Sequence, residues 1–303
     1  MSEKVNVAKV VYGGWPNCYK ISDGKVEAIA TSDVGPRVIY LGVAGGKNLF
    51  AEFEEQMGKT NAKEWLIFGG HRLWHSPETW GRCYHPDSVP VNVTELPNGV
   101  HLTQPVEPNT NIQKELIITL NPGSHQFTVE HRMTNRGNWP VNFALWALSV
   151  MKPGGTAILP QYRAADAEGL LPNRTLELWP YTDMSDSRAT WGSRFILIAQ
   201  DTQKPEPFKI GLTVPEGWAA YAVDGILFQK RFAYDPEAIY PDAGVNVELY
   251  TNHRMLELET LSPLRTVAPG ATATHTETWI LHQGVGQIKT EADASSQVIP
   301  IIK

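Results

Sequence analysis

Residues 68–78 concentrate side chains that bind ligands and transfer protons. The segment reads Phe-Gly-Gly-His-Arg-Leu-Trp-His-Ser-Pro-Glu. Glycines let a backbone approach a ligand closely, an indole face packs on a sugar ring, and charged groups supply donors, acceptors and protons. A loop whose polar groups satisfy one another is the structural alternative. The density of functional groups favours a ligand site, and its candidate residues are His71, Arg72, Trp74, His75 and Glu78.

A pair of glutamates near the end of the chain forms a second candidate group. In a strand, Glu257 and Glu259 point to the same face, about 6 to 7 Å apart, while the leucines beside them point to the other. Two carboxylates at this separation disfavour joint ionisation, which raises the pKa of one of them and suits acid or base chemistry on a hydroxyl. An ordinary solvated strand face, or a glutamate that orients an arginine, is the alternative.

The histidines fit acid–base chemistry better than metal binding. His71 and His75 are four residues apart, a spacing that would put two zinc ligands on one face of a helix. The paired glycines and Pro77 disfavour a helix, and no third ligand is identifiable, so we expect no metal site. As acids, the two imidazoles need only reach one substrate oxygen. His85 is a weaker candidate for the same site, and His131 is predicted to be a core residue.

The chain has ten tryptophans, and two outside the first segment are candidates for sugar contacts. Trp191 stands among polar and turn residues, whereas Trp146 belongs to a strongly apolar run and either fills the core or faces a cleft. Sugar recognition pairs aromatic planes with polar rims. A phosphate-binding loop, a dinucleotide fingerprint and a Gly-x-Ser-x-Gly elbow are absent from the sequence, which argues against nucleotide-dependent and serine-hydrolase chemistry.

Composition narrows the class of protein. The 303 residues are 42% hydrophobic, and the net charge of −6 comes with 26 scattered basic residues, so we expect no nucleic-acid partner. No apolar run approaches the roughly 18 residues of a membrane span, and the first residues contain no long apolar stretch, so we expect a cytoplasmic protein without a membrane partner. Two cysteines in unrelated contexts indicate no disulfide framework. The oligomeric state is left open.

Short alternating runs separated by turn residues predict antiparallel strands. Residues 125–133 alternate most clearly, and an Asn-Pro-Gly turn before them predicts a hairpin with residues 113–120. Residues 141–151 are apolar on both faces, which predicts a central strand between two layers. No repeat or linker appears, so we expect one all-β domain over residues 1–303, a large antiparallel sandwich, with residues 154–191 forming long loops over one sheet.

These features resemble the aldose 1-epimerase, or galactose mutarotase-like, superfamily. The resemblance lies in the Gly-Gly segment with Arg72, the apolar strand 143–151, and Glu259 ahead of the Val-Ala-Pro-Gly sequence at residues 267–270. It implies a β-supersandwich in which a sugar lies on the concave face of a sheet. It also implies that Glu259 acts as the base on the anomeric hydroxyl, with Glu257 as second choice, and that Arg72 binds the substrate.

The sequence departs from this family at one position. Mutarotases commonly carry a histidine followed by an aromatic residue in the middle apolar strand, and here that place reads Leu-Trp-Ala at residues 145–147. The acid would then come from His71, His75 or His85. The segment at residues 68–75 looks like that of an uncharacterised branch of the superfamily.

The leading hypothesis is a carbohydrate-active isomerase that interconverts the anomers of a sugar or sugar derivative. It needs Glu and His as base and acid and requires no cofactor. Two alternatives remain: a non-catalytic sugar-binding protein on the same sandwich, and a glycan lyase or hydrolase. The residues expected to contact the sugar besides the catalytic groups are Arg72, Trp74, Glu78, His85, Trp146, Trp191 and Glu257.

Overall fold

The structure is a computed structural model that describes residues 4–163 and 170–302, and antiparallel strands dominate it. Within these residues the first sheet has eleven strands. Its order is β1 (Asn6–Tyr12), β2 (Trp15–Ser22), β3 (Val26–Thr31), β4 (Arg37–Val43), β5 (Gly70–Ser76), β10 (Val141–Met151), β19 (Leu256–Leu261), β18 (Val247–Thr251), β15 (Phe208–Leu212) and β12 (Leu176–Leu178), and β20 (Arg265–Val267) also pairs with β10.

The second sheet has ten strands in the described part of the chain. Its order is β13 (Ala189–Trp191), β14 (Phe195–Ala199), β11 (Thr156–Pro160), β16 (Trp218–Val223), β17 (Ile226–Phe232), β21 (Thr272–Gln283), β9 (Gln126–Asn135), β8 (Ile112–Asn121), β7 (Gly99–Thr103) and β6 (Asn92–Leu96). The helical elements are short: α1 (Trp80–Cys83), the 3-10 turn η1 (Asp242–Gly244) and α2 (Glu291–Gln297). None of the described helices has the length and apolar character needed to cross a bilayer.

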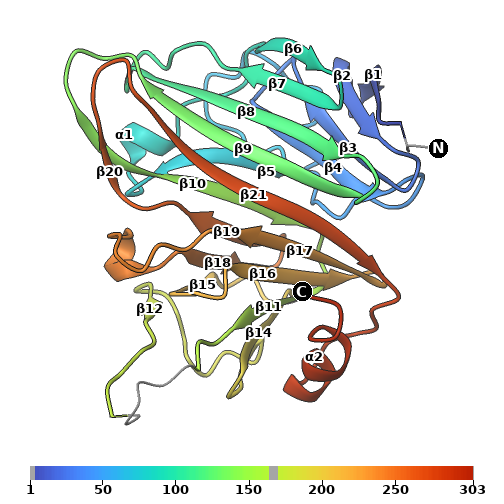
Figure 1. The fold of residues 1–303 in the computed structure, drawn as a ribbon, viewed down its shortest axis with the longest axis vertical. Helices are drawn as coiled ribbons and strands as arrows, with labels where there is room; N and C mark the ends of the chain where they lie inside the picture. The colour runs from blue at the N-terminus through green and yellow to red at the C-terminus, as the bar shows by residue number, and fades with distance from the viewer. Residues whose placement is uncertain (1–3, 164–169, 303) are drawn as a thin grey trace.

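The two sheets face each other and enclose the core between them (Figure 1). Alternation along β8 and β9 sends Leu116, Ile118 and Val129 inward, where they join the same apolar cluster as Leu258 of the first sheet. The prediction of a large all-β antiparallel sandwich is confirmed. The predicted hairpin is present, and β8 and β9 pair from Ile112 opposite Asn135 to Asn121 opposite Gln126.

Strand β10 is the centre of the first sheet, as its two apolar faces predict. It pairs with β5 on one side and with β19 on the other. Leu148 lies opposite Arg72 in β5 and opposite Glu259 in β19, so these three side chains share one face of the sheet. That face is the outer one, because Leu256 and Leu258, which alternate with Glu257 and Glu259 along β19, point into the core.

Residues 70–76 form strand β5 rather than a ligand-binding loop. The preceding glycines serve the packing of this strand: both have positive φ, and a Cβ at Gly69 or Gly70 would lie 2.0 Å from the Ala51 carbonyl oxygen or 2.2 Å from the Val38 carbonyl oxygen. The close approach is therefore between backbones, not between backbone and ligand. A strand also sends neighbouring side chains to opposite faces, which divides the candidate residues of this segment.

Candidate functional site

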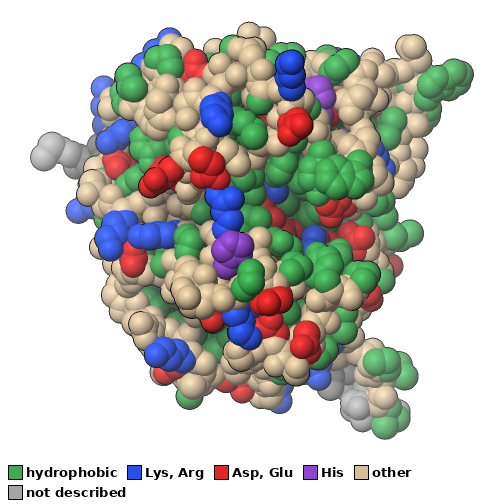
Figure 2. Space-filling model, turned by 180° about the vertical axis from the view of Figure 1, so that it is seen from behind, with side chains coloured by type: hydrophobic (Ala, Val, Ile, Leu, Met, Phe, Trp, Pro, Cys, Tyr) green, Lys and Arg blue, Asp and Glu red, His purple; other side chains and the backbone are tan. Residues whose placement is uncertain are grey.

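A pocket of about 360 Å³ lies on the outer face of the first sheet. Its floor comes from β5, β10, β19, β18 and β15, and its rim comes from the loops around residues 65–67, 78–84 and 181. Figure 2 shows the molecule from behind the view of Figure 1, where acidic and basic side chains lie among hydrophobic ones around a hollow. The side chains that matter below are Trp65, Arg72, Trp74, Glu78, Tyr84, Trp146, Tyr181, Lys209, Tyr250, Glu257 and Glu259.

Arg72 is held in place by a carboxylate and two indoles. Its Nη1 lies 2.7 Å from Oε1 of Glu257, and its guanidinium carbon lies 4.5 Å above the ring of Trp74 and 5.3 Å above that of Trp65. A planar guanidinium stacks well on aromatic faces and keeps its edge donors available. Arg72 therefore presents fixed hydrogen-bond donors to the pocket.

Glu259 is the carboxylate at the base of the pocket. Its Oε2 accepts a hydrogen bond of 2.8 Å from Nε1 of Trp146 and lies 3.5 Å from Nζ of Lys209. Burial raises the pKa of Glu259, and the ammonium of Lys209 partly opposes that shift. A carboxyl group with a raised pKa changes its protonation state more readily near neutral pH than an exposed one.

Lys209 joins this carboxylate to a second one. Its Nζ lies 2.7 Å from Oε2 of Glu248 and sits 4.5 Å from the ring centroids of both Trp146 and Trp179. Burial disfavours the ammonium, but the charges of Glu259 and Glu248 outweigh burial and raise the pKa of Lys209. Burial also raises the pKa of Glu248. Lys209 is therefore protonated beside Glu259 and carries protons that it can donate.

The pocket collects polar atoms that the described residues leave without a hydrogen-bond partner. Nη1 of Arg72 and Oε1 of Glu257 are not among them, because they form an ion pair at 2.7 Å. In a folded protein such buried atoms normally have partners, and a buried site that lacks them is suited to a polar ligand. The atoms in this pocket are Nε1 of Trp65, Nε of Arg72 and Oε1 of Glu259.

His71 lies on the opposite face of β5 from Arg72, inside the sandwich. Its Nδ1 is 2.8 Å from Oγ of Ser149, and its Nε2 is 2.7 Å from Nε2 of His131. Burial lowers the pKa of His71 well below its usual range. This position corrects the assignment of His71 as an acid for the sugar, because the strand itself separates the imidazole from the pocket.

His75 also points into the sandwich, where its ring packs against Phe143, and burial lowers its pKa to about 2. Its assignment as an acid is corrected for the same reason as that of His71. Arg72 and Trp74 are two positions apart along the strand and both face the pocket, so Leu73 between them and His75 after them face inward. No histidine of the described chain lines the pocket.

The interior around His71 is a completed polar network. Nδ1 of His131 donates to the backbone oxygen of His275, and Nε2 of His275 is 2.8 Å from Oγ1 of Thr260. Glu277 lies beyond it, and its carboxylate accepts from Nζ of Lys230 at 2.9 Å. Oxygen and nitrogen atoms of His71, His131 and Glu277 lie within 4.8 Å of one another, as metal ligands do, but these atoms already have protein partners.

Of three other residues predicted to contact the sugar, Glu78 lines the pocket, and His85 and Trp191 do not. Glu78 lines the pocket and accepts a hydrogen bond from the hydroxyl of Tyr84. His85 does not line it. Trp191 belongs to β13 of the second sheet, where its indole donates to the Met184 backbone oxygen and its ring lies 6.5 Å from that of Phe208. Its place beside the core corrects the expectation of a sugar contact.

Several pocket residues were absent from the sequence-based assignment. Lys209, Glu248 and Tyr250 come from strands β15 and β18, which pair with each other and carry these side chains on the outer face. Alternation within residues 208–214 and 245–250 indicates that these side chains share the polar face of each strand, but it does not indicate which strands lie beside them. Tyr181 comes from the long middle segment that the sequence marked as loops over a sheet. Placing it over the pocket needs the tertiary structure.

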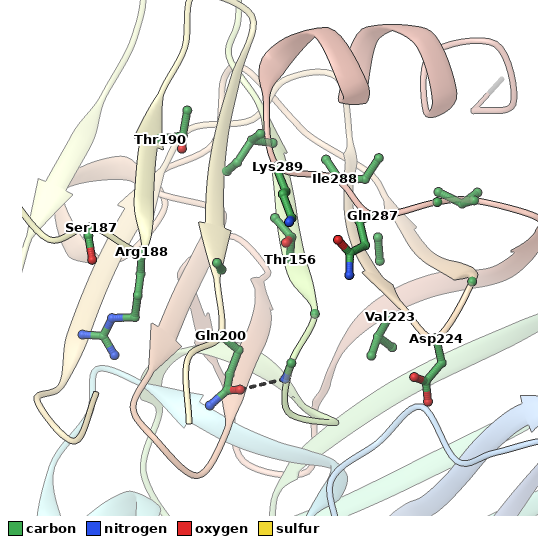
Figure 3. Close-up of a pocket in the computed structure, with 18 residues that line it drawn as sticks. Thr156, Ser187, Arg188, Thr190, Gln200, Val223, Asp224, Gln287, Ile288 and Lys289 are labelled. Atoms are coloured by element: carbon green, nitrogen blue, oxygen red, sulfur yellow. Dashed lines mark hydrogen bonds between the residues drawn. The ribbon is translucent and has the colours of Figure 1, made fainter. Parts of the chain in front are cut away.

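A second, larger cavity lies elsewhere in the molecule. It measures about 680 Å³ and is bordered by β11, β14, β16 and the segment before α2, with Lys289 and Gln287 directed toward it (Figure 3). Its charged residues are mostly paired within the protein: Asp224 binds Lys152, and Arg188 binds Asp186 at 2.7 Å. This cavity contains one unpartnered buried atom, Nη1 of Arg188, whereas the 360 Å³ pocket contains three, together with aromatic walls and the carboxylates of Glu257 and Glu259, so we place the candidate site in the 360 Å³ pocket.

Comparison with known proteins agrees with this architecture. No protein-family model matches the chain, and no curated protein matches its sequence. A candidate aldose 1-epimerase from Klebsiella pneumoniae subsp. pneumoniae superimposes with a TM-score of 0.61 at 13% identity, covering 98% of this chain and 86% of its own. The Slr1438 protein from Synechocystis sp. PCC 6803 gives a TM-score of 0.59 at 13% identity, covering 91% of this chain and 99% of its own.

A galactose mutarotase-like protein from Lactobacillus casei ATCC 334 gives a TM-score of 0.58 at 13% identity over 88% of this chain and 100% of its own. The chain has the galactose mutarotase-like fold. The resemblance inferred from the sequence is thus confirmed at the level of fold. At 13% identity these comparisons show a shared fold and do not show a shared reaction.

Proposed function

We propose that the protein binds an aldose in the pocket around Arg72 and Glu259 and interconverts its anomers. The observation that carries this proposal is a cluster of three buried polar atoms, Nε1 of Trp65, Nε of Arg72 and Oε1 of Glu259, that have no hydrogen-bond partner among the described residues and lie between aromatic walls. A pyranose matches such a site, because its hydroxyls pair with the polar atoms while its C–H faces pack on the rings. The fold shared with mutarotase-like proteins supports the same ligand class.

Glu259 is the proposed acid–base group. Its Oε1 has no partner within the described residues, while Oε2 is fixed by Trp146, so one oxygen is oriented and the other faces the ligand. Lys209 is the proposed donor to the ring oxygen. The anomeric hydroxyl and the ring oxygen are bonded to the same carbon, and the 3.5 Å between Nζ of Lys209 and Oε2 of Glu259 lets the two groups address both atoms.

The reaction on these groups is balanced. Glu259 takes the proton of the anomeric hydroxyl, a carbonyl forms at the anomeric carbon, and the electron pair of the bond to the ring oxygen moves onto that oxygen. Lys209 stabilises the developing charge and gives it a proton. Rotation about the neighbouring carbon–carbon bond and reclosure on the other face of the carbonyl return both protons and yield the other anomer. Arg72 and Glu257 hold the remaining hydroxyls.

The test measures exchange between the α and β anomers of D-glucose and D-galactose by NMR, together with binding by calorimetry. We expect wild-type protein to accelerate exchange. Glu259→Gln removes the base and keeps the shape, so it should lower the exchange rate about 10²- to 10⁴-fold while binding is retained. Glu95→Gln, on an exposed position of β6, is the matched control and should exchange as wild type. Unchanged exchange in Glu259→Gln would remove Glu259 from the mechanism.

Non-catalytic sugar binding is the second candidate function. It is favoured by the absence of histidine from the pocket lining among the described residues, since the family resemblance implies a histidine acid. This function predicts saturable binding of an aldose by the wild-type protein with no acceleration of anomer exchange. The same two measurements therefore separate the two functions.

A further inference from the structure

A second lobe adjoins the sugar pocket on the same face of the sheet. It measures about 340 Å³ and shares with the first pocket the side chains of Glu78, Tyr84, Trp146 and Lys209. The two lobes therefore meet across common walls rather than lying at separate places on the surface. Each is of a size that suits one small ligand unit.

The second lobe has an aromatic plane that the fold does not need for its core. Trp80 is 82% exposed, yet its ring is stacked on Tyr84 with centroids 4.3 Å apart and planes 30° apart. The ring of Trp179 also lines this lobe and is held by the ammonium of Lys209. Exposed rings fixed in orientation by stacking are suited to packing against the C–H face of a sugar.

A buried polar atom points to a ligand here independently of the aromatic rings. Glu248 is 1% exposed and lines this lobe; its Oε2 binds Lys209, while its Oε1 has no partner among the described residues. Thr79 and Asp242 add further polar groups to the lining. The lobe thus repeats the pairing of aromatic faces with hydrogen-bonding groups that marks the first pocket.

The charges of the second lobe favour an uncharged occupant. The ionisable groups in its lining are Glu78, Asp242, Glu248 and Lys209, three acidic groups against one base. Lys209 is already engaged by Glu248 at 2.7 Å and lies 3.5 Å from Glu259. A phosphate or carboxylate placed here would meet net negative charge, which costs binding energy in a partly buried site.

We infer that this lobe binds a second pyranose ring, so that the preferred ligand is an uncharged reducing disaccharide. This inference rests on the proposed function for the orientation of the ligand: the reducing ring lies beside Glu259 and the second ring lies between Trp80 and Trp179. The linkage between the rings passes the shared wall of Trp146 and Lys209.

The experiment compares dissociation constants, measured by calorimetry, for the disaccharides maltose, cellobiose and lactose with those for glucose and galactose. We expect at least one disaccharide to bind about ten-fold more tightly than its monosaccharide units. Trp80→Ala should reduce that preference to near unity. Trp139→Ala, which removes an equally exposed indole (79%) from outside both lobes, is the matched control and should keep the preference.

The outcomes separate this inference from the proposed function. Disaccharide preference that depends on Trp80, without anomer exchange on any sugar, supports the second lobe and overturns catalysis. Anomer exchange with no disaccharide preference, or with a preference that Trp80→Ala leaves intact, overturns the second lobe alone. Absence of binding to every sugar in the panel overturns both.

Discussion

The two faces of β5 carry two different kinds of polar site. On the inner face, His71 belongs to a network in which imidazoles, hydroxyls, an ammonium and a carboxylate bind one another. On the outer face, Arg72 and the glutamates of β19 and β18 leave buried atoms without partners. The inner site is complete and contributes to the fold, whereas the outer site is incomplete and is suited to a ligand.

The same division runs across the neighbouring strands. Ser149 and Thr260 point inward from β10 and β19 and bind histidines of the network. Trp146 and Glu259 point outward from the same two strands and bind each other. Burial alone does not distinguish the two sites, since Glu259 is as inaccessible as the residues of the network. The presence or absence of protein partners does.

The largest expected effect on stability comes from a substitution that breaks the inner network. Lys230→Met removes the cation that lies 2.9 Å from Glu277 and leaves a fully buried carboxylate with less compensation. We expect the free energy of unfolding, measured in urea, to fall by about 3 to 5 kcal/mol. Lys25→Met, at an exposed position, is the control and should change stability little. Equal stability of the two variants would show that the network does not hold the fold.

The pH dependence of stability also distinguishes the inner polar groups from the outer site. Burial lowers the pKa of His275 to about 3 and that of His75 to about 2, and it also lowers the pKa of His71 and His131. Because the unfolded imidazoles take up protons below the ordinary value of 6.5 and the folded ones do not, stability falls as pH drops below 6.5. Each histidine contributes about 1.4 kcal/mol per pH unit to this fall.

The carboxyl groups of the outer site change stability in the opposite direction to the histidines as the pH falls. Glu248 and Glu259 have raised pKa values, so in acid the folded protein takes up their protons before the unfolded chain does, and this offsets part of the loss. Because the four histidines outnumber the two carboxyls, we expect a net fall in unfolding free energy from pH 6.5 to 5, measured by denaturant titration at each pH. His275→Asn should make the slope shallower. A flat profile would contradict the assignment of neutral buried imidazoles.

Much of the architecture was predictable because a sandwich strand reveals itself by its period of two. Residues 125–133 and the doubly apolar run at 141–151 became β9 and β10. The same reasoning predicts that Glu257 and Glu259 lie together on one face, since Leu256 and Leu258, which alternate with them, are buried.

The candidate site was only partly predictable, and strand β5 shows why. Its glycines and proline are typical of a loop, and they conceal the period of two that separates His71 from Arg72. The physical reason for the glycines, close contact with two other backbone segments, is visible only in the folded chain. Lys209 was missed because one lysine in an apolar strand gives no indication of which strands will flank it.

The most direct test compares two adjacent residues of β5, by titrating an aldose, or the tightest-binding sugar of the panel, into Arg72→Lys and His71→Asn. The lysine cannot reproduce the stacked guanidinium, so we expect its dissociation constant to rise about ten- to a hundred-fold with the fold retained. His71→Asn should lose about 1 to 3 kcal/mol of unfolding free energy and keep the wild-type dissociation constant. Lost affinity in folded His71→Asn, with affinity intact in Arg72→Lys, would contradict the assignment of the outer face as the sugar site.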